Sequence, residues 1–232
     1  MITNAEIRQI RSLREKKFRD ELGLFVVEGE KMVQEALMSS FEVVRVWRRE
    51  EVGEAAMEKM SQFSSPSPVL AVVSKPKPEG IVLERGLYLA LDSVRDPGNV
   101  GTIIRIADWF GINTVFVSPD CADIYNPKVI QASMGSIFRV KTVFADIADI
   151  CRRFRAADMN VYGTLLDGKD IYEATLENEG LVVMGNEANG LSAAVRAEVT
   201  SALLIPRSGG SKAESLNVAA ATAVTLSEFR RR

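Results

Sequence analysis

The sequence contains no histidine and only two cysteines, Cys121 and Cys151, which lie far apart in the chain. The lack of histidine excludes a Ser–His–Asp triad, a Cys–His pair and every histidine-ligated metal site. Two separated cysteines also argue against a disulfide framework and against a zinc site. We therefore expect no metal, and any acid–base chemistry must come from other side chains, from the substrate or from water.

The 232-residue chain also lacks long apolar runs and an excess of charge of either sign. No uncharged apolar run approaches the roughly 18 residues that a membrane span needs, and the polar N-terminus does not resemble a secretory signal. We therefore expect a globular, cytoplasmic protein. The 29 basic and 31 acidic residues give a net charge of −2, so the total charge does not indicate a polyanion-binding protein.

The basic residues are nevertheless clustered in two places. One cluster lies near the N-terminus and the other about thirty residues later, and they comprise Arg8, Arg11, Arg14, Lys16, Lys17 and Arg19, then Arg45, Arg48 and Arg49. A solvated helix face explains such a pattern, and so does a local binding surface for a polyanion. The sequence leaves both explanations open.

The order of predicted elements divides the chain into two α/β domains. Residues 1–76 alternate between helices and strands, beginning with one amphipathic helix over residues 3–20 that Thr3 or Asn4 caps. Residues 77–86 form a linker with proline and glycine. Residues 87–232 begin with the apolar run LYLAL, which is typical of a strand buried on both faces of a mostly parallel sheet.

The segment SVRDPGNVGTIIR, residues 93–105, follows this first buried strand. Its glycines form GxxG, whereas a dinucleotide-binding loop has GxGxxG and a P-loop ends in GK[ST]. The segment predicts a helix that begins near Val100 with Asn99 as its N-cap, and a solvent-facing Arg105 is the ordinary explanation for that arginine. Ligand sites of open α/β sheets gather at the carboxyl ends of strands, so Asn99 and Arg105 are also candidate site residues.

Two further polar segments follow later strands. VVMGNEANGLS, residues 182–192, places Glu187 in a glycine-rich loop, and Ser192 is suited to cap the next helix. IPRSGGSKAESLNVAAATAV, residues 205–224, predicts a helix that begins between Glu214 and Leu216. Ser215 and Asn217 then lie near a helix N-terminus, where backbone N–H groups are unpaired.

Taken together and in this order, the three segments resemble the signature motifs of the SpoU (TrmH) family of RNA ribose 2′-O-methyltransferases, within the SPOUT class. The resemblance covers residues 87–232. Residues 1–76, through IRQIRSLREKKFRDELGLFVVEGEKMVQEAL, are similar to the ribosomal-protein-L30e-like substrate-binding domain of rRNA-directed members. The resemblance implies a homodimer that binds S-adenosylmethionine in a deep trefoil knot.

The resemblance also assigns roles to individual residues. Polar active-site positions match Asn99, Arg105, Glu187, Ser215 and Asn217. Cofactor contacts, made largely by backbone, match Gly185, Asn186, Ile205, Pro206 and Leu216. The N-terminal residues expected to contact RNA are Arg8, Arg11, Arg14 and Lys16.

The implied reaction is methyl transfer to a ribose 2′-OH of structured RNA, with 23S ribosomal RNA favoured by the N-terminal domain. Transfer RNA as the substrate, a non-catalytic RNA-binding module and a Rossmann-type enzyme for a small molecule are the alternatives. A guanidinium is not a base at neutral pH. Arg105 is therefore expected to bind phosphate and the developing oxyanion, or to help a proton reach phosphate.

Overall fold

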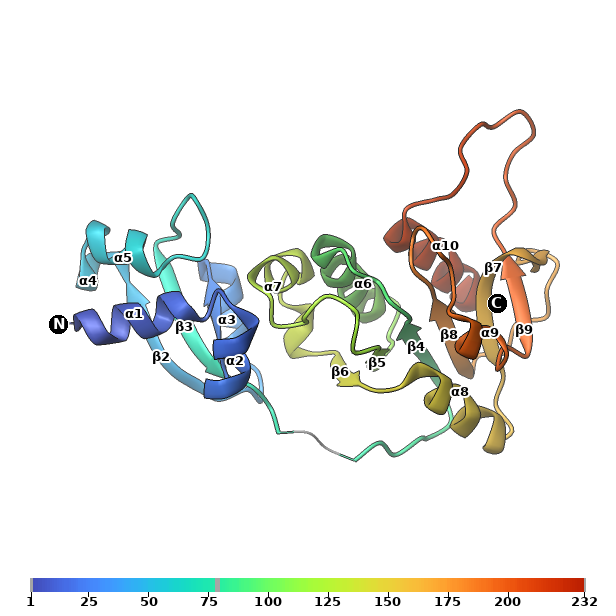
Figure 1. Ribbon diagram of the computed structural model, residues 1–232, viewed down its shortest axis with the longest axis horizontal. Helices are drawn as coiled ribbons and strands as arrows, with labels where there is room; N and C mark the ends of the chain where they lie inside the picture. Colours follow the sequence, from blue (N-terminus) through green and yellow to red (C-terminus); the bar gives the residue numbers. More distant parts are fainter. Residues whose placement is uncertain (1, 78–79, 232) are drawn as a thin grey trace.

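The computed structural model describes residues 2–77 and 80–231. Residues 78 and 79, inside the predicted linker, and residues 1 and 232, at the predicted outer domain boundaries, lie outside the described residues. Two α/β bodies lie side by side along the long axis of the molecule, and an extended segment connects them (Figure 1). No helix among the described residues has the length and apolar character to cross a membrane.

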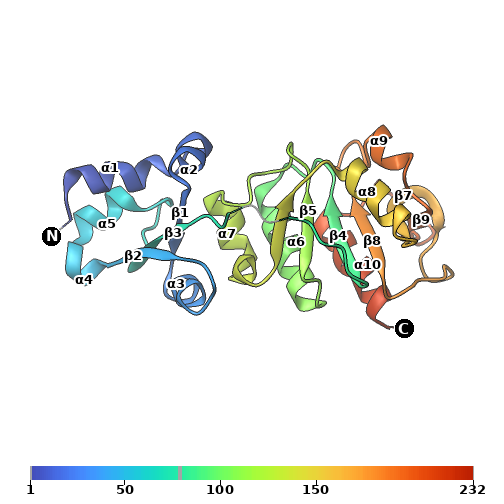
Figure 2. The ribbon, with the colours of Figure 1, turned by 90° about the horizontal axis from the view of Figure 1, so that it is seen from below.

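The N-terminal body is built on a three-stranded antiparallel sheet of order β1-β3-β2. Its strands are β1 Leu24–Glu28, β2 Val43–Arg48 and β3 Val69–Ser74. Its helices are α1 Asn4–Ser12, α2 Lys16–Leu22, α3 Glu30–Leu37, α4 Arg49–Val52 and α5 Glu54–Met60. Helices α1 and α5 cover one face of this sheet and α3 covers the other (Figure 2).

The single helix predicted over residues 3–20 was wrong, because the chain turns between α1 and α2. Thr3 caps the start of α1, as predicted. Its hydroxyl accepts from Glu6 N at 3.2 Å, while the Glu6 carboxylate accepts from Thr3 N at 2.7 Å. The turn buries Leu13 in the small core. Its free carbonyls are satisfied by Arg19, whose Nη1 donates to Leu13 O at 2.8 Å and to Arg14 O at 2.7 Å.

The C-terminal body contains a six-stranded sheet of order β6-β5-β4-β8-β7-β9, in which every pairing is parallel. Its strands are β4 Leu87–Leu91, β5 Thr114–Val117, β6 Lys141–Phe144, β7 Val161–Asp170, β8 Gly180–Met184 and β9 Ser201–Leu204. Its helices are α6 Pro97–Trp109, α7 Pro127–Ser133, the 3₁₀ turn η1 Ser136–Phe138, α8 Ile147–Ala156, α9 Ala193–Arg196 and α10 Val218–Arg231. The parallel α/β sheet predicted from the sequence is confirmed.

Helices cover both faces of the six-stranded sheet. Leu89 and Leu91 of β4 pack toward α6 and α10, whereas Ala90, between them, packs toward α8 and α9. This alternation follows from the period of two along a strand. Strands β4 and β8 lie side by side at the centre, where the order of connection reverses, and such a reversal is where α/β sheets hold their ligands.

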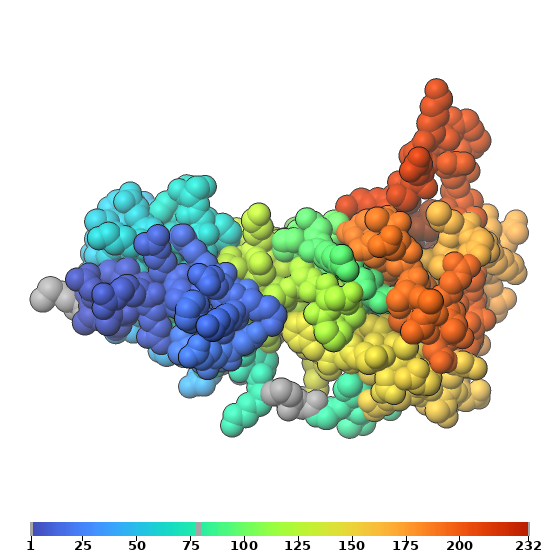
Figure 3. All heavy atoms as spheres, in the orientation of Figure 1, coloured from blue at the N-terminus to red at the C-terminus, as the bar shows by residue number. Residues whose placement is uncertain are grey.

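One apolar cluster continues from the small sheet into the C-terminal body. Phe25 and Val27 of β1 belong to the same buried cluster as Tyr125 and Val129, which lie near α7. Helix α7 packs against β1, and the space-filling view shows the two bodies in contact at this level (Figure 3). The two sheets are therefore joined by a packed interface as well as by the connecting segment.

Candidate active site

The centre of the candidate site is formed by the loops that leave β4 and β8. These strands pair in register, Leu91 with Met184, so residues 92–96 and 185–192 emerge next to each other. Asp92 is buried, and its carboxylate accepts from Ser192 N at 2.7 Å. Asn186 Nδ2 donates to Ser93 O at 2.8 Å. The two loops are therefore fixed to each other before any ligand is considered.

The loop after β8 folds back tightly on itself. Asn186 and Gly190 exchange two backbone hydrogen bonds, both of 2.9 Å, and the Asn186 carboxamide oxygen accepts from Ala188 N and Asn189 N. A Cβ on Gly185 would lie 2.4 Å from the carbonyl carbon of Gly190, so only glycine fits there. Asn186 orders this loop with its side chain, and its expected cofactor contact stays a prediction.

Asn99 lies at the start of α6, but it does not cap the helix as predicted. Asp96 is the N-cap: its carboxylate accepts from Asn99 N at 2.8 Å, and Pro97 occupies the first helical turn. An acid followed by proline favours this earlier start. The Asn99 carboxamide is therefore free of a capping role, and its Nδ2 donates to Glu187 Oε1 at 2.6 Å.

Asn217 joins the third segment to the same group. Its Nδ2 donates to Asn99 Oδ1 at 2.9 Å, and its Oδ1 accepts from Ala219 N at 3.0 Å and Ala220 N at 3.3 Å. The side chain thus caps α10, which begins at Val218 and not between Glu214 and Leu216 as predicted. Glu187, Asn99 and Asn217 form one hydrogen-bonded chain that connects all three segments.

Arg105 lies one and a half turns further along α6, about 9 Å from Asn99 along the helix axis. Its side chain is exposed. Among the described residues it has no hydrogen bond or ion pair, in contrast to most arginines of this chain. The guanidinium is consequently free to bind an anion that approaches the site.

Residues 205–217 form a loop that stands away from the body of the molecule (Figure 1). Ile205 and Pro206 are half-buried, whereas Ser215 and Leu216 are exposed, Leu216 to 52%. The structure does not connect Ser215 to the Glu187–Asn99–Asn217 chain by any hydrogen bond among the described residues. The roles expected of Ser215 and Leu216 remain predictions.

Most backbone groups of this loop have no hydrogen-bond partner among the described residues, which suits a ligand that is held by backbone groups. Within residues 207–216 the hydrogen bonds are from Arg207 to Ala213 O, from Ser211 N to Ser208 O and from Ala213 N to the Ser211 hydroxyl. The other backbone groups there have no partner among the described residues. Free N–H and C=O groups next to an exposed leucine suit a ligand with a polar ring edge and an apolar face.

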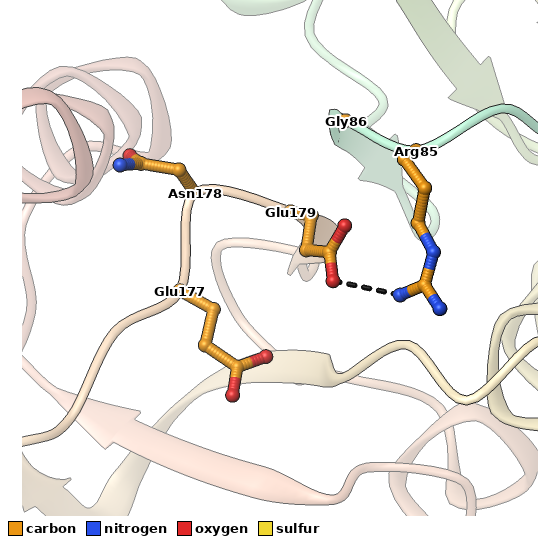
Figure 4. Close-up of a pocket in the computed structure, with 5 residues that line it drawn as sticks. All are labelled: Arg85, Gly86, Glu177, Asn178 and Glu179. Carbon is orange, nitrogen blue, oxygen red and sulfur yellow. Dashed lines mark hydrogen bonds and ion pairs between the residues drawn. The ribbon is translucent and has the colours of Figure 1, made fainter.

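A separate hollow of about 500 Å³ lies at the other ends of the central strands, away from the candidate site. It is lined by Arg85, Gly86, Glu177, Asn178 and Glu179, and an ion pair of 2.7 Å joins Arg85 to Glu179 (Figure 4). These residues precede β4 and β8, so the hollow is at the amino ends of the strands. Catalytic groups of parallel sheets lie at the carboxyl ends, and we do not assign this hollow to the active site.

The N-terminal basic residues divide into free and engaged groups. Arg8 and Arg11 of α1 are exposed and have no ion pair among the described residues. They line a shallow hollow of about 390 Å³ with Ser12, Arg14 and Glu15. Arg14 donates to Ser61 O, and Lys16 pairs with Asp20.

The structure corrects the extent of this basic surface. Arg19, counted with the first cluster, is 2% exposed and pairs with Asp123 of the other body. Each member of the second cluster has an acidic partner: Arg45 with Glu6, Arg48 with Glu30 and Arg49 with Glu54. Arg8 and Arg11 are therefore the clearest free cations of the predicted RNA surface.

Asp92 and Asp96 are the site residues that the sequence analysis did not single out. One is the buried carboxylate that holds the β8 loop, and the other caps α6. Both had a signal in the sequence: Asp92 directly follows the apolar run LYLAL, and Asp96 directly precedes proline. Among the described residues no cluster of acidic or sulfur side chains is suited to hold a metal ion.

Comparison with protein families gives two matches that together span nearly the whole chain. Residues 86–227 match the SpoU rRNA Methylase family, and residues 4–75 match the MRM3-like substrate binding domain. The chain belongs to the SpoU rRNA methylase family. The three polar segments that meet at Asn99 all lie within the first match.

Three relatives of this SpoU protein are similar to it over nearly their full lengths. The 23S rRNA (guanosine(2553)-2′-O)-methyltransferase RlmP of Bacillus subtilis is 30% identical over 98% of this chain and 96% of its own length. A putative RNA methyltransferase of the TrmH family from Porphyromonas gingivalis is 40% identical with a TM-score of 0.91, over 100% of this chain and 99% of its own. An AdoMet-bound rRNA methyltransferase from Sinorhizobium meliloti is 32% identical with a TM-score of 0.90, over 100% and 96%.

Proposed function

We propose that this protein transfers a methyl group from S-adenosylmethionine to a ribose 2′-OH of 23S ribosomal RNA. The observation that carries the proposal is the Glu187–Asn99–Asn217 chain, which brings one residue from each family segment to the carboxyl ends of β4 and β8. The full-length similarity to rRNA 2′-O-methyltransferases supports ribosomal RNA over transfer RNA. A ribosomal substrate also agrees with a cytoplasmic location.

The cofactor is expected to lie between the loops after β8 and β9. Gly185, Asn186, Ile205, Pro206 and Leu216 would hold it, mainly through the free backbone groups of the 205–217 loop. When bound, S-adenosylmethionine supplies a methyl group on a sulfonium, which an oxygen nucleophile can attack in line.

The protein's own contribution is orientation and charge. Asn99 is oriented by its bonds to Glu187 and Asn217, so its carboxamide is fixed at the mouth of the site. Arg105, which has no partner among the described residues, is suited to bind the RNA phosphate next to the target ribose and the developing alkoxide oxygen. Placing oxygen, methyl and sulfur in line supplies most of the rate enhancement.

We also propose the finer features that the family resemblance implies. The chain divides into a substrate-binding domain of L30e type, residues 1–76, a linker, residues 77–86, and a methyltransferase domain, residues 87–232, with a trefoil knot at its C-terminus. The active form is a homodimer. The indole of Trp109, at the end of α6, is 85% exposed and offers apolar surface of the kind that subunit interfaces bury.

The decisive experiment is to map 2′-O-methyl groups on unmodified 23S ribosomal RNA after incubation with the protein and S-adenosylmethionine. Methylation of one ribose by the wild-type chain, and its loss with Arg105→Ala, is expected. Methylation of transfer RNA alone would establish that alternative. Absence of any shift in melting temperature with S-adenosylmethionine would favour a non-catalytic RNA-binding module, and a shift with NAD or ATP instead would favour a nucleotide enzyme.

A further inference from the structure

We propose that the joint between the two domains determines which ribose is methylated. We define the joint as two contacts: the Arg19–Asp123 ion pair with the rings around it, and the Arg139–Glu35 ion pair with the rings beside it. The inference rests on the proposed function and goes beyond it. It assigns the choice of nucleotide to residues outside both the RNA-binding surface and the methyl-transfer site.

The first contact is a buried ion pair between α2 and the loop after β5. The Arg19 and Asp123 side chains are 2% and 7% exposed, and Arg19 Nε and Nη2 both donate to Asp123 Oδ2, at 3.0 and 2.6 Å. The remaining nitrogen, Nη1, binds the carbonyls of the turn between α1 and α2. One guanidinium therefore fixes α1, with its free Arg8 and Arg11, to the catalytic domain.

Aromatic packing lies next to this ion pair, because Tyr125 N donates to Asp123 Oδ1 at 3.1 Å. The rings of Phe25 and Tyr125 are 4.8 Å apart between centroids, and the Lys75 ammonium lies 5.1 Å from the Tyr125 ring. Lys75 follows directly after β3, so the end of that strand contributes to the contact as well as α2. Such close-packed rings resist sliding, because any displacement opens voids.

The second contact lies at α3 and prevents rotation about the first. Arg139 pairs with Glu35 of α3 and, at 2.8 Å, with Asp108 of α6. Phe41 and Phe138 meet edge to face, with 5.2 Å between centroids. Because the two contacts lie at different places between the domains, together they restrain the N-terminal domain against sliding and against rotation about either contact alone.

The loop that carries Asp123 is hydrogen-bonded to the loop after β4, which belongs to the active site. Ala122 N donates to Val94 O at 3.0 Å, and Ser93 N donates to the Ser118 hydroxyl at 2.9 Å. Ser93 in turn accepts from Asn186 at its carbonyl oxygen. Hydrogen bonds thus run from the joint through residues 93–94 to the loop that carries Glu187.

The connecting segment does not fix the domains by itself. Its described residues, 75–77 and 80–86, contain no helix or strand. Ile81 and Leu83 already pack on the catalytic domain, and the half-dozen residues from Lys75 to Ile81 can span up to roughly 20 Å when extended. Successive nucleotides of a helical strand advance by only a few ångströms. A shift of a few ångströms between the RNA-binding surface and the site would therefore present a neighbouring ribose.

The test compares methylation maps of 23S ribosomal RNA for the wild-type chain and the double variant Arg19→Met/Asp123→Leu. Replacing both partners avoids leaving one buried charge unpaired, which would destabilise the fold. Because the Leu13 and Arg14 carbonyls also lose their Arg19 donor, the melting temperature of the variant is measured beside its methylation map. We expect methylation at the parent ribose to fall about 100-fold and methyl groups to appear on neighbouring riboses. The melting-temperature shift with S-adenosylmethionine should stay as in the wild type.

Two controls separate position from general damage. Arg85→Met/Glu179→Leu removes an ion pair at the amino ends of β4 and β8 (Figure 4). This variant should keep the parent methylation map. Inserting Gly-Ser-Gly-Ser between Gly80 and Ile81 should also keep the map in the wild-type chain, but it should broaden the map further in the Arg19→Met/Asp123→Leu background.

Three results would overturn the inference. One is a double variant that methylates the parent ribose alone, at whatever rate, because a purely structural ion pair would lower activity without changing position. Another is an altered map from the linker insertion alone, which would assign nucleotide choice to the linker. If the wild-type chain methylates no ribosomal RNA at all, the proposed function itself fails and the inference fails with it.

Discussion

At the scale of single residues, the site depends on which atoms of three side chains donate and which accept. The Glu187 carboxylate only accepts, so it orients the Asn99 amide nitrogen toward itself and leaves the Asn99 oxygen to accept from Asn217. Asn217 also uses its oxygen to cap α10. Each amide is therefore held in one orientation by its neighbour.

The variant Asn99→Asp tests this order of donors and acceptors. It retains the acceptor toward Asn217 but replaces the donor toward Glu187 with a second carboxylate at about the same distance. Two carboxylates in contact repel each other and raise the pKa of one of them. We expect methyl transfer at neutral pH to fall about 100-fold, with partial recovery toward acid pH, measured as single-turnover rates. A rate equal to that of the wild type at neutral pH would contradict the arrangement.

Arg105→Lys tests whether the forked guanidinium is needed. The charge is kept, but the bidentate contact with phosphate or alkoxide is lost. Because Arg105 is exposed and unpaired among the described residues, we expect no change in melting temperature and a fall of about 100-fold in kcat. Turnover at the parent rate would show that a simple positive charge is sufficient.

At the scale of elements, the loops after β4 and β8 keep their shape because they are packed backbone to backbone. Gly185 lies where the loop after β8 returns to Gly190, and Asp92 and Asn186 link this loop to the one after β4. These are short loops on rigid strands. Their geometry is therefore set by the sheet and does not require a ligand.

The variant Gly185→Ala should open this loop. Its Cβ would meet the backbone of Gly190 at 2.4 Å, and overpacking against backbone costs about 1–3 kcal/mol. We expect a lower melting temperature and weaker binding of S-adenosylmethionine by calorimetry. Gly209→Ala is the matched control, since a Cβ there has no atom within 4 Å, and its melting temperature should equal that of the wild type.

The loop after β5 has its own pH dependence. Hydrogen bonds from Ser118 and then Ser93 hold the pKa of Asp120 below its ordinary value of 3.8. A lowered pKa in the folded state means that the stabilisation exists above that ordinary value and is lost as pH falls through the folded-state pKa. Asp120→Asn should therefore lower the melting temperature slightly near neutral pH, with the difference vanishing in strong acid. A difference that persisted at the lowest pH would assign the effect to packing.

At the scale of the whole molecule, RNA binding should depend on a small number of charges. The net charge is −2, and the second basic cluster is neutralised by its acidic partners. Arg8 and Arg11 of α1 are exposed and have no ion pair within the part of the chain that the structure describes. A local surface of this kind fixes the position of the RNA through its phosphates, while the active site selects the ribose.

Reversing these charges should change the salt dependence of binding. Each phosphate contact contributes a slope of about 0.7–0.9 in log affinity against log salt, so Arg8→Glu/Arg11→Glu should reduce the slope by about 1.5. Arg48→Ala, which removes a cation already paired with Glu30, should change it much less. Fluorescence anisotropy with an rRNA fragment measures both, and equal slopes for all three proteins would show that α1 only faces solvent.

The sequence by itself determined the features that depend on neighbours in the chain. Alternation of apolar runs with amphipathic segments predicted the parallel α/β sheet, and the three polar segments contained Asn99, Glu187 and Asn217, which the fold brings together. The capping of α1 by Thr3 and of α9 by Ser192, whose hydroxyl accepts from Val195 N, is local in the same sense, because a cap is decided within a few residues. The α1–α2 break was missed because its carbonyls are satisfied by Arg19 and not by helical neighbours.

Only the tertiary structure decided how distant residues are used. Asn99 looked like a helix cap, but its partners are Glu187 and Asn217, 88 and 118 positions away. Arg19 looked like part of a solvent-facing basic surface, but it is buried against Asp123, 104 positions away. The physical reason is that periodicity encodes which face a residue occupies, whereas burial and partner depend on which other element packs there.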